Sequence, residues 1–161
     1  MSDNINILKS RSFKLNMEKG VDYPGIGLVY FCHDGNGNFL MSHRKDTCRD
    51  ERGKWDIGGG AIEFGEKVIE TLKKEIKEEY STDIIEYEFL GYRDIHRIDD
   101  NKKTHWVGLD FKVLIDSKKV KNGEPHKFYE IGWFNKNNMP SKELLHSQLT
   151  YFLEKYKDKL F

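Results

Sequence analysis

The chain has 161 residues, the length of one ordinary globular domain, so it can bury a core without disulfides or a structural metal. Its 27 basic and 27 acidic residues cancel to a formal net charge of zero, which argues against a general binder of nucleic-acid polymers. No apolar stretch approaches the roughly 20 residues of a membrane-spanning helix, and no signal peptide is visible. These features predict a cytoplasmic protein, with no membrane partner, whose two cysteines are free thiols.

The chain divides into a short polar extension and one domain. Residues 1–22 form the extension, with an edge strand expected at residues 5–15, and such a strand would allow a homodimer. In the domain, residues 23–161, apolar runs predict strands at residues 26–32, 39–44, 55–57, 84–98, 104–115 and 131–134. The first two strands flank a Gly/Asn-rich turn and are expected to form a hairpin.

Two stretches show helical rather than strand spacing. Apolar residues recur at helical intervals over residues 66–80 and 141–160, and Ser141 is the expected N-cap of the second helix. A glycine-rich loop at residues 58–60 precedes the first helix. Strands paired by hairpins, with helices between and after them, indicate an α/β (α+β) fold with a mixed sheet.

Three carboxylates share one face of the first predicted helix, because Glu75 precedes Glu78 and Glu79 by three and four residues. Such like-charged pairs destabilise an isolated helix by roughly 0.2–0.5 kcal/mol each. A divalent cation would remove this cost, and carboxylate oxygens suit Mg²⁺ or Mn²⁺. The alternative is a solvated helix face, but three consecutive glycines beside it permit a ligand to approach the backbone closely.

The segment from Gly60 to residue 82 resembles the Nudix box, G-x5-E-x7-R-E-U-x-E-E-x-G-U, in which U is a bulky apolar residue. The box glycine and four glutamates match as Gly60, Glu66, Glu75, Glu78 and Glu79. Residues 55–60 resemble the Trp-x-Leu-Pro-Gly-Gly that often precedes the box. The resemblance implies a Nudix-type α/β/α sandwich with a mixed central sheet. It also implies hydrolysis of a nucleoside diphosphate linked to a further group.

Three positions depart from the family pattern. Lys74 replaces the box arginine and loses its planar fork. Ser81 replaces a glycine that would suit a left-handed helix cap, so an irregular turn is expected there. Gly58 replaces a proline and is expected to loosen the glycine loop. No carboxylate is lost, so we expect the metal site to be intact.

The resemblance implies a role for each candidate site residue. Glu75 and Glu78 are the expected catalytic carboxylates, and Lys74 the residue that positions a box glutamate. Mg²⁺, or Mn²⁺, is expected on Glu66, Glu75, Glu78, Glu79, the Gly60 carbonyl and one glutamate from the loop before the last Trp-containing strand. Glu130 is the first candidate for this loop glutamate and Glu124 the second. Substrate contacts are expected from Arg44, Gly59, Glu63 and His105.

Three functions are compatible with these residues. Residues 23–27 and 58–66 resemble MutT-type pyrophosphohydrolases, which implies conversion of a (deoxy)nucleoside triphosphate to its monophosphate and pyrophosphate. A nucleotide-sugar hydrolase of GDP-mannose or ADP-ribose type is the alternative, because residues 104–107 and 146–154 are similar to GDP-mannose mannosyl hydrolases. The complete set of glutamates favours attack at phosphorus. A catalytically weak nucleotide-binding regulator is the third hypothesis, supported only by the departures at Lys74, Ser81 and Gly58.

Overall fold

The computed structural model describes residues 16–99 and 101–161, so the strand expected at residues 5–15 lies outside the described part. Six of the described elements form a first group along the chain: β1 (Gly25–His33), β2 (Phe39–Arg44), β3 (Trp55–Asp56), β4 (Gly58–Ala61), α1 (Val68–Tyr80) and β5 (Ile84–Asp99). They are followed by β6 (Lys102–Ile115), β7 (Phe128–Phe134), a short 3₁₀ helix η1 (Lys142–Leu144) and α2 (Ser147–Leu160). The strands and helices predicted for residues 23–161 are present, and the structure adds β4 and η1, which were not predicted.

The sheet is mixed, as predicted. Its main path runs β3-β2-β1-β6-β5, β4 pairs with β1, and β7 pairs with β2. Strand β1 runs parallel to β6, whereas the other pairs are antiparallel. Strands β1 and β2 pair only at His33 and Phe39, so the predicted hairpin is joined at its turn and then opens. Beyond that point β1 pairs with β4 in place of β2.

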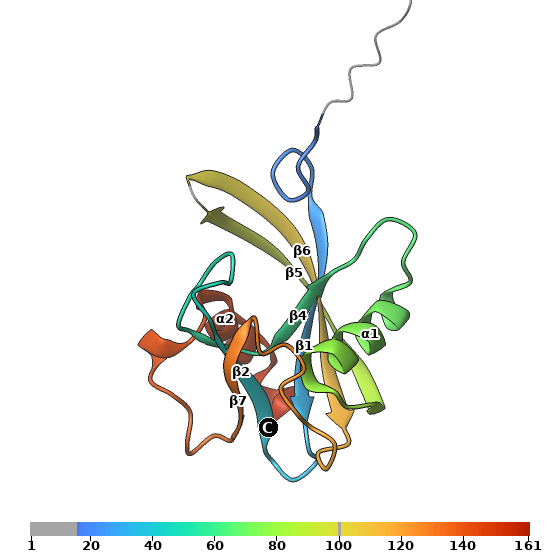
Figure 1. The fold of residues 1–161 in the computed structure, drawn as a ribbon, viewed down its shortest axis with the longest axis vertical. Helices are drawn as coiled ribbons and strands as arrows, with labels where there is room; N and C mark the ends of the chain where they lie inside the picture. Colours follow the sequence, from blue (N-terminus) through green and yellow to red (C-terminus); the bar gives the residue numbers. More distant parts are fainter. Residues whose placement is uncertain (1–15, 100) are drawn as a thin grey trace, which may run out of the picture.

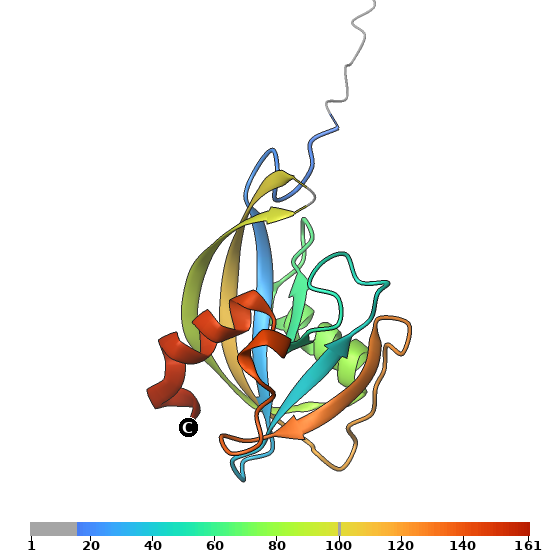
Figure 2. The same ribbon diagram turned by 90° about the vertical axis from the view of Figure 1, so that its left-hand side faces the viewer.

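The two helices cover opposite faces of the sheet (Figures 1 and 2). Side chains of β1 alternate between the two faces, as a strand requires. Leu28, Tyr30 and Cys32 join the buried cluster that includes α1, whereas Phe31 joins the cluster that includes α2. This arrangement confirms the predicted α/β/α sandwich. Within the described residues, neither helix has the length and apolar character needed to cross a bilayer.

The second long helix begins later than the sequence predicts. Ser141 caps only η1, and α2 starts at Ser147 with His146 as its N-cap. The chain between them is extended, because the backbone N–H of His146 donates to the carbonyl of Trp55 at 2.8 Å. The His146 ring then accepts a hydrogen bond from the Gln148 N–H, which caps α2.

The prediction of a glycine-rich loop is wrong, because residues 58–60 belong to strand β4. The strand pairs with residues 27–30 of β1. A Cβ at Gly58 would overlap the ring of Tyr30, which is completely buried. Gly58 therefore does not loosen this segment. It leaves the space that the Tyr30 ring fills, and a side chain at this position would push β4 away from β1.

Ser81 ends α1 in the left-handed conformation that a glycine would favour, with φ of 54°. Its N–H donates to the Lys77 carbonyl, so the helix closes as it would with glycine. The serine thus preserves the shape of the turn, at the steric cost of a left-handed side-chain-bearing residue.

We expect Gly58→Ala to destabilise the fold by about 2 kcal/mol, because the added methyl group overpacks a fully buried aromatic site. Chemical denaturation monitored by tryptophan fluorescence measures this change. Gly27→Ala on the neighbouring strand is the matched control, because a Cβ there would make only ordinary contacts, the nearest at 3.4 Å. Equal stability losses in the two variants would contradict this account of Gly58.

Candidate active site

Strand β4 lies directly against the carboxylate face of α1. A Cβ at Gly60 would lie 2.4 Å from the carboxyl carbon of Glu75, so a larger residue there would displace this side chain from its present position. At the adjacent Gly59, a Cβ would lie 3.0 Å from the Leu28 carbonyl oxygen, which is a tight contact. The bare backbone of β4 therefore forms one wall of the acidic site.

Helical spacing brings the box carboxylates together but buries them unequally. Glu79 is buried, Glu75 is half-buried and Glu78 is exposed. Glu79 Oε2 accepts a hydrogen bond of 2.6 Å from the hydroxyl of Tyr30. Burial raises the pKa of Glu79 to about 8, and the nearby charges of Glu124 and Glu75 add to this effect. Burial, followed by the charge of Glu78, also raises the pKa of Glu75.

The loop before β7 adds a further carboxylate to this cluster. Backbone N–H groups of Lys121 and Gly123 donate to the carbonyls of Tyr80 and Glu79 at the end of α1. The next residue, Glu124, is thereby held beside Glu75 and Glu79, and its charge raises the pKa of both. Its Oε1 pairs with Lys127 Nζ at 2.8 Å, whereas its Oε2 is buried without a hydrogen-bond partner.

Glu130, the first candidate for the loop glutamate, lies on the other face of the sheet. It pairs in register with His43 of β2, and its exposed carboxylate lies 3.8 Å from the His43 ring. Its neighbour Ile131 packs into the core on the α1 side. Because successive strand residues point to opposite faces, Glu130 faces away from the helix that carries the box glutamates. The structure brings Glu124 to the cluster instead.

Lys74 keeps the ion pair that the box arginine would make. Its Nζ lies 2.9 Å from Glu66 Oε1 and 3.9 Å from Glu75 Oε1. The other oxygen of Glu66 accepts hydrogen bonds from the Glu63 N–H and the Thr71 hydroxyl. Glu66 is thus fixed beside the first turn of α1, and its hydrogen bond with Lys74 lowers its pKa.

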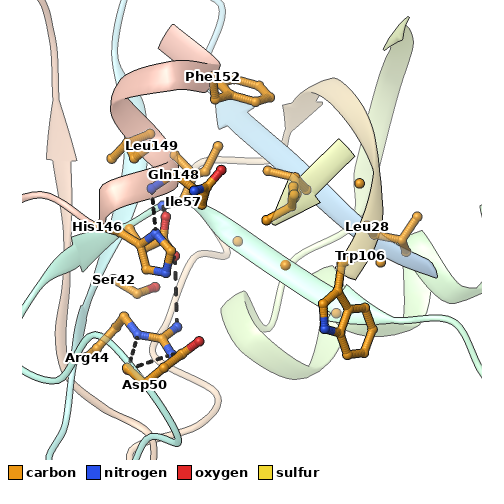
Figure 3. A pocket seen from close by; sticks show the side chains of 18 of the residues that line it. Leu28, Ser42, Arg44, Asp50, Ile57, Trp106, His146, Gln148, Leu149 and Phe152 are labelled. Atoms are coloured by element: carbon orange, nitrogen blue, oxygen red, sulfur yellow. Dashed lines mark hydrogen bonds and ion pairs between the residues drawn. The ribbon is translucent and has the colours of Figure 1, made fainter. Parts of the chain in front are cut away.

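A cavity of about 280 Å³ adjoins the acidic cluster (Figure 3). Glu79 and residues 58–60 line one part of it, and Trp106 lies beside them. Four arginines, two carboxylates and two residues at the start of α2 also line it: Arg44, Arg49, Arg93, Arg97, Asp50, Asp56, His146 and Gln148. Among the expected substrate contacts, Arg44 and Gly59 line this cavity, and Arg44 already pairs with Asp50 at 2.6 Å.

The other two expected substrate contacts lie outside the cavity lining. The His105 ring stacks on His96 with ring centroids 4.2 Å apart, while the adjacent Trp106 lines the cavity. Glu63 is exposed and pairs with Lys19 at 2.6 Å. No local sequence pattern marks five further residues of the lining, because they come from separate segments of the chain: Arg97, Asp50, Asp56, His146 and Gln148. The alternation of side chains along residues 92–98 is the one local signal, since it places Arg93 and Arg97 on the same face of the predicted strand.

A family model described as the NUDIX domain matches residues 24–156. The chain belongs to the Nudix domain family. Its acidic helix and glycine strand are therefore the box of a Nudix domain, at the positions that the sequence motif predicted.

This Nudix domain is similar to a Caenorhabditis elegans protein whose name assigns it to the nudix hydrolases, with 29% identity over 125 residues. The match covers 68% of this chain but only 46% of that protein, so the chain spans about half the length of this relative. The structure resembles a MutT NUDIX hydrolase from Burkholderia pseudomallei, with a TM-score of 0.70, 23% identity, and 82% and 97% of the two chains covered.

The NUDIX domain of Shewanella oneidensis NrtR, solved in complex with ADP ribose, has the same fold. Its TM-score is 0.68 at 16% identity, and the match covers 86% of this chain and 90% of that one. At such identities the likeness to solved structures establishes the fold of the Nudix domain and leaves its substrate open.

The pKa of Glu79 links the stability of the Nudix domain to pH. An ordinary glutamate ionises near 4.5, whereas folded Glu79 holds its proton until about pH 8. Between these pH values the folded state binds one more proton at Glu79 than the unfolded state does. Without metal, the free energy of unfolding should therefore fall as pH rises through this range, by a few kcal/mol as an order of magnitude.

Glu79→Gln removes this titration while keeping an oxygen that accepts the Tyr30 hydrogen bond. We expect the difference in unfolding free energy between wild type and variant to shift in favour of the variant as pH rises from about 4.5 to 8. Denaturant titrations in EDTA across this range measure it. Parallel pH profiles for the two proteins would contradict a raised pKa at Glu79.

Proposed function

We propose that this Nudix domain is a divalent-cation-dependent hydrolase of a small nucleotide. The first candidate substrate is a (deoxy)nucleoside triphosphate, cleaved to the monophosphate and pyrophosphate. The observation that carries the proposal is a partly buried carboxylate cluster that reaches a cavity through the buried Glu79. A phosphate chain beside the glutamates and a base or sugar in the cavity would fill both parts of this site.

The residues of the cluster suit a hard divalent cation such as Mg²⁺ or Mn²⁺. They offer only carboxylate and carbonyl oxygens, the ligand atoms that such cations prefer. The proposed ligands are Glu66, Glu75, Glu78, Glu79 and the Gly60 carbonyl. Within residues 16–99 and 101–161, no three His, Cys, Asp or Glu side chains already converge on one point, so binding would draw these carboxylates together.

The chain's own groups supply the remaining chemistry. A bound divalent cation neutralises phosphate charge and lowers the pKa of a coordinated water. We assign to the carboxylate of Glu124 the role of accepting a proton from the attacking water, a role that the resemblance had given to Glu75. Lys74 holds Glu66 in place, and the glycine backbone of β4 leaves room for phosphate oxygens next to Gly59.

A nucleotide-sugar hydrolase of ADP-ribose or GDP-mannose type is the second candidate. The ADP-ribose complex of the NrtR Nudix domain supports it, since that domain shares this fold. The two candidates differ in the product, which is pyrophosphate from a triphosphate and either a sugar phosphate or a free sugar from a nucleotide sugar. Product identification in a substrate panel with Mg²⁺ therefore separates them.

Substitution of Glu124 tests the proposed site most directly. We expect Glu124→Gln to lower kcat by about 100-fold or more, because it removes a positioned proton acceptor. Glu79→Gln should lower it comparably by weakening the metal site. Glu130→Gln is the matched control and should stay within about twofold of wild type, because its side chain faces the opposite side of the sheet.

Normal turnover in Glu124→Gln together with a severe loss in Glu130→Gln would overturn this assignment. If the wild-type protein bound a nucleotide tightly but hydrolysed none in the panel with Mg²⁺ or Mn²⁺, the regulator hypothesis would replace the enzyme.

A further inference from the structure

The turn that carries Glu124 is held from a second side, by the loop of residues 45–54 that joins β2 to β3. Three consecutive carbonyls after Glu124 accept hydrogen bonds from this loop: Pro125 from Lys45 Nζ at 2.6 Å, His126 from Thr47 Oγ1 at 2.7 Å, and Lys127 from the Lys45 N–H at 2.8 Å. Segments about 80 positions apart in the sequence are thereby joined along the whole length of the turn.

The turn itself transmits a displacement of these carbonyls to Glu124. The backbone N–H groups of Lys127 and Phe128 donate to the carbonyl of Glu124 at 2.8 and 3.0 Å, which closes residues 124–128 into one tight unit. Lys127 Nζ also pairs with Glu124 Oε1 at 2.8 Å. Backbone and side chain of Glu124 are therefore both tied to the residues that the 45–54 loop holds.

The 45–54 loop is anchored well enough to hold the turn. At its base, the Arg44 N–H donates to the Lys54 carbonyl and the Gly53 N–H donates to the Arg44 carbonyl, each at 2.9 Å. Inside the loop, Arg44 Nη2 donates to the Asp50 carbonyl at 3.1 Å and to its carboxylate at 2.6 Å. The loop is thus fixed at its base and at its centre, and it lies between the cavity that Asp50 lines and the turn of Glu124.

Thr47 is the contact of this loop whose chemistry is simplest to interpret. Its side chain is uncharged, and it does not belong to the cavity lining. The hydroxyl donates to the carbonyl of His126, two residues after Glu124. An effect of Thr47 on hydrolysis would therefore run through the geometry of the turn. A displacement of about 1 Å in a catalytic group can lower a rate by about 100-fold.

We propose that Thr47 is a positioning residue for Glu124. Its hydroxyl holds the His126 carbonyl, and through residues 124–128 it sets where the Glu124 carboxylate lies relative to the attacking water. This inference rests on the proposed function, because it takes Glu124 as the proton acceptor. It adds a residue that acts on the hydrolytic step from outside both the Nudix box and the cavity.

A valine substitution removes the hydroxyl and keeps the shape of the side chain. We expect Thr47→Val to lower kcat by about tenfold and to leave KM within about twofold, because the proton acceptor is displaced while the cavity is unchanged. Thr47→Ser restores the donor and should recover at least half of the wild-type kcat. Thr150→Val is the matched control, since it makes the same change on α2, which covers the opposite face of the sheet, and kcat should stay within about twofold.

A double-mutant cycle shows whether Thr47 acts through Glu124. In the Glu124→Gln background, Thr47→Val should cause no further loss of kcat, because the group that Thr47 positions is already absent. A further tenfold loss in the double variant would mean that Thr47 acts independently of Glu124, and it would overturn the inference.

Amide hydrogen exchange followed by NMR measures the turn without any turnover. The N–H groups of Lys127 and Phe128, which close the turn, should exchange about tenfold faster in Thr47→Val than in wild type or Thr47→Ser. Amides of β6 should keep their wild-type rates, which shows that the rest of the fold persists. Unchanged exchange at both turn amides would contradict the proposed hold on the turn.

The results separate this inference from the proposed function. Hydrolysis by the wild-type protein with an unchanged kcat in Thr47→Val would overturn the inference alone, even if the turn amides exchange faster. A Thr47→Ser variant as slow as Thr47→Val would overturn it too, because the serine hydroxyl can make the same hydrogen bond. If the wild-type protein hydrolysed no nucleotide, the proposed function would fail and the inference would fail with it.

Discussion

The active site depends on the close contact between the glycine strand β4 and its neighbours. Gly58 leaves room for the ring of Tyr30, and the hydroxyl of that ring holds the buried Glu79. Gly60 leaves room for the carboxyl group of Glu75, which a larger residue would displace. A side chain at Gly58 would push β4 away from β1, and the cavity that residues 58–60 line would change shape.

Within residues 16–99 and 101–161, two buried polar side-chain atoms lack a hydrogen-bond partner, and they have opposite chemistry. Glu124 Oε2 is an acceptor in the acidic cluster, and Arg97 Nε is a donor of a residue that lines the cavity. The formal net charge of zero therefore conceals an uneven distribution, with carboxylates gathered around α1 and arginines gathered around Asp50.

The sequence predicted those features that are local along the chain. Glu75, Glu78 and Glu79 are within one helical turn, so the helical repeat alone places them together. Strand pairing decides the sheet face on which Glu130, His105 and Trp106 lie. The position of Glu124 depends on the backbone hydrogen bonds between its loop and the end of α1. Arg97 and Asp50 meet across 47 positions of sequence, and no local pattern encodes such a contact.

The three departures from the box pattern differ in what they change. Lys74 forms an ion pair with Glu66, and Gly58 leaves the space that the Tyr30 ring fills. Both residues thereby preserve the contacts around the carboxylates. Ser81 instead adopts the left-handed conformation itself, which leaves the last carbonyls of α1 open to the loop that crosses them. The N–H groups of Lys121 and Gly123 occupy those carbonyls, as helix ends require. This capping fixes the position of Glu124, so the end of the helix and the fifth carboxylate of the site are set by the same backbone hydrogen bonds.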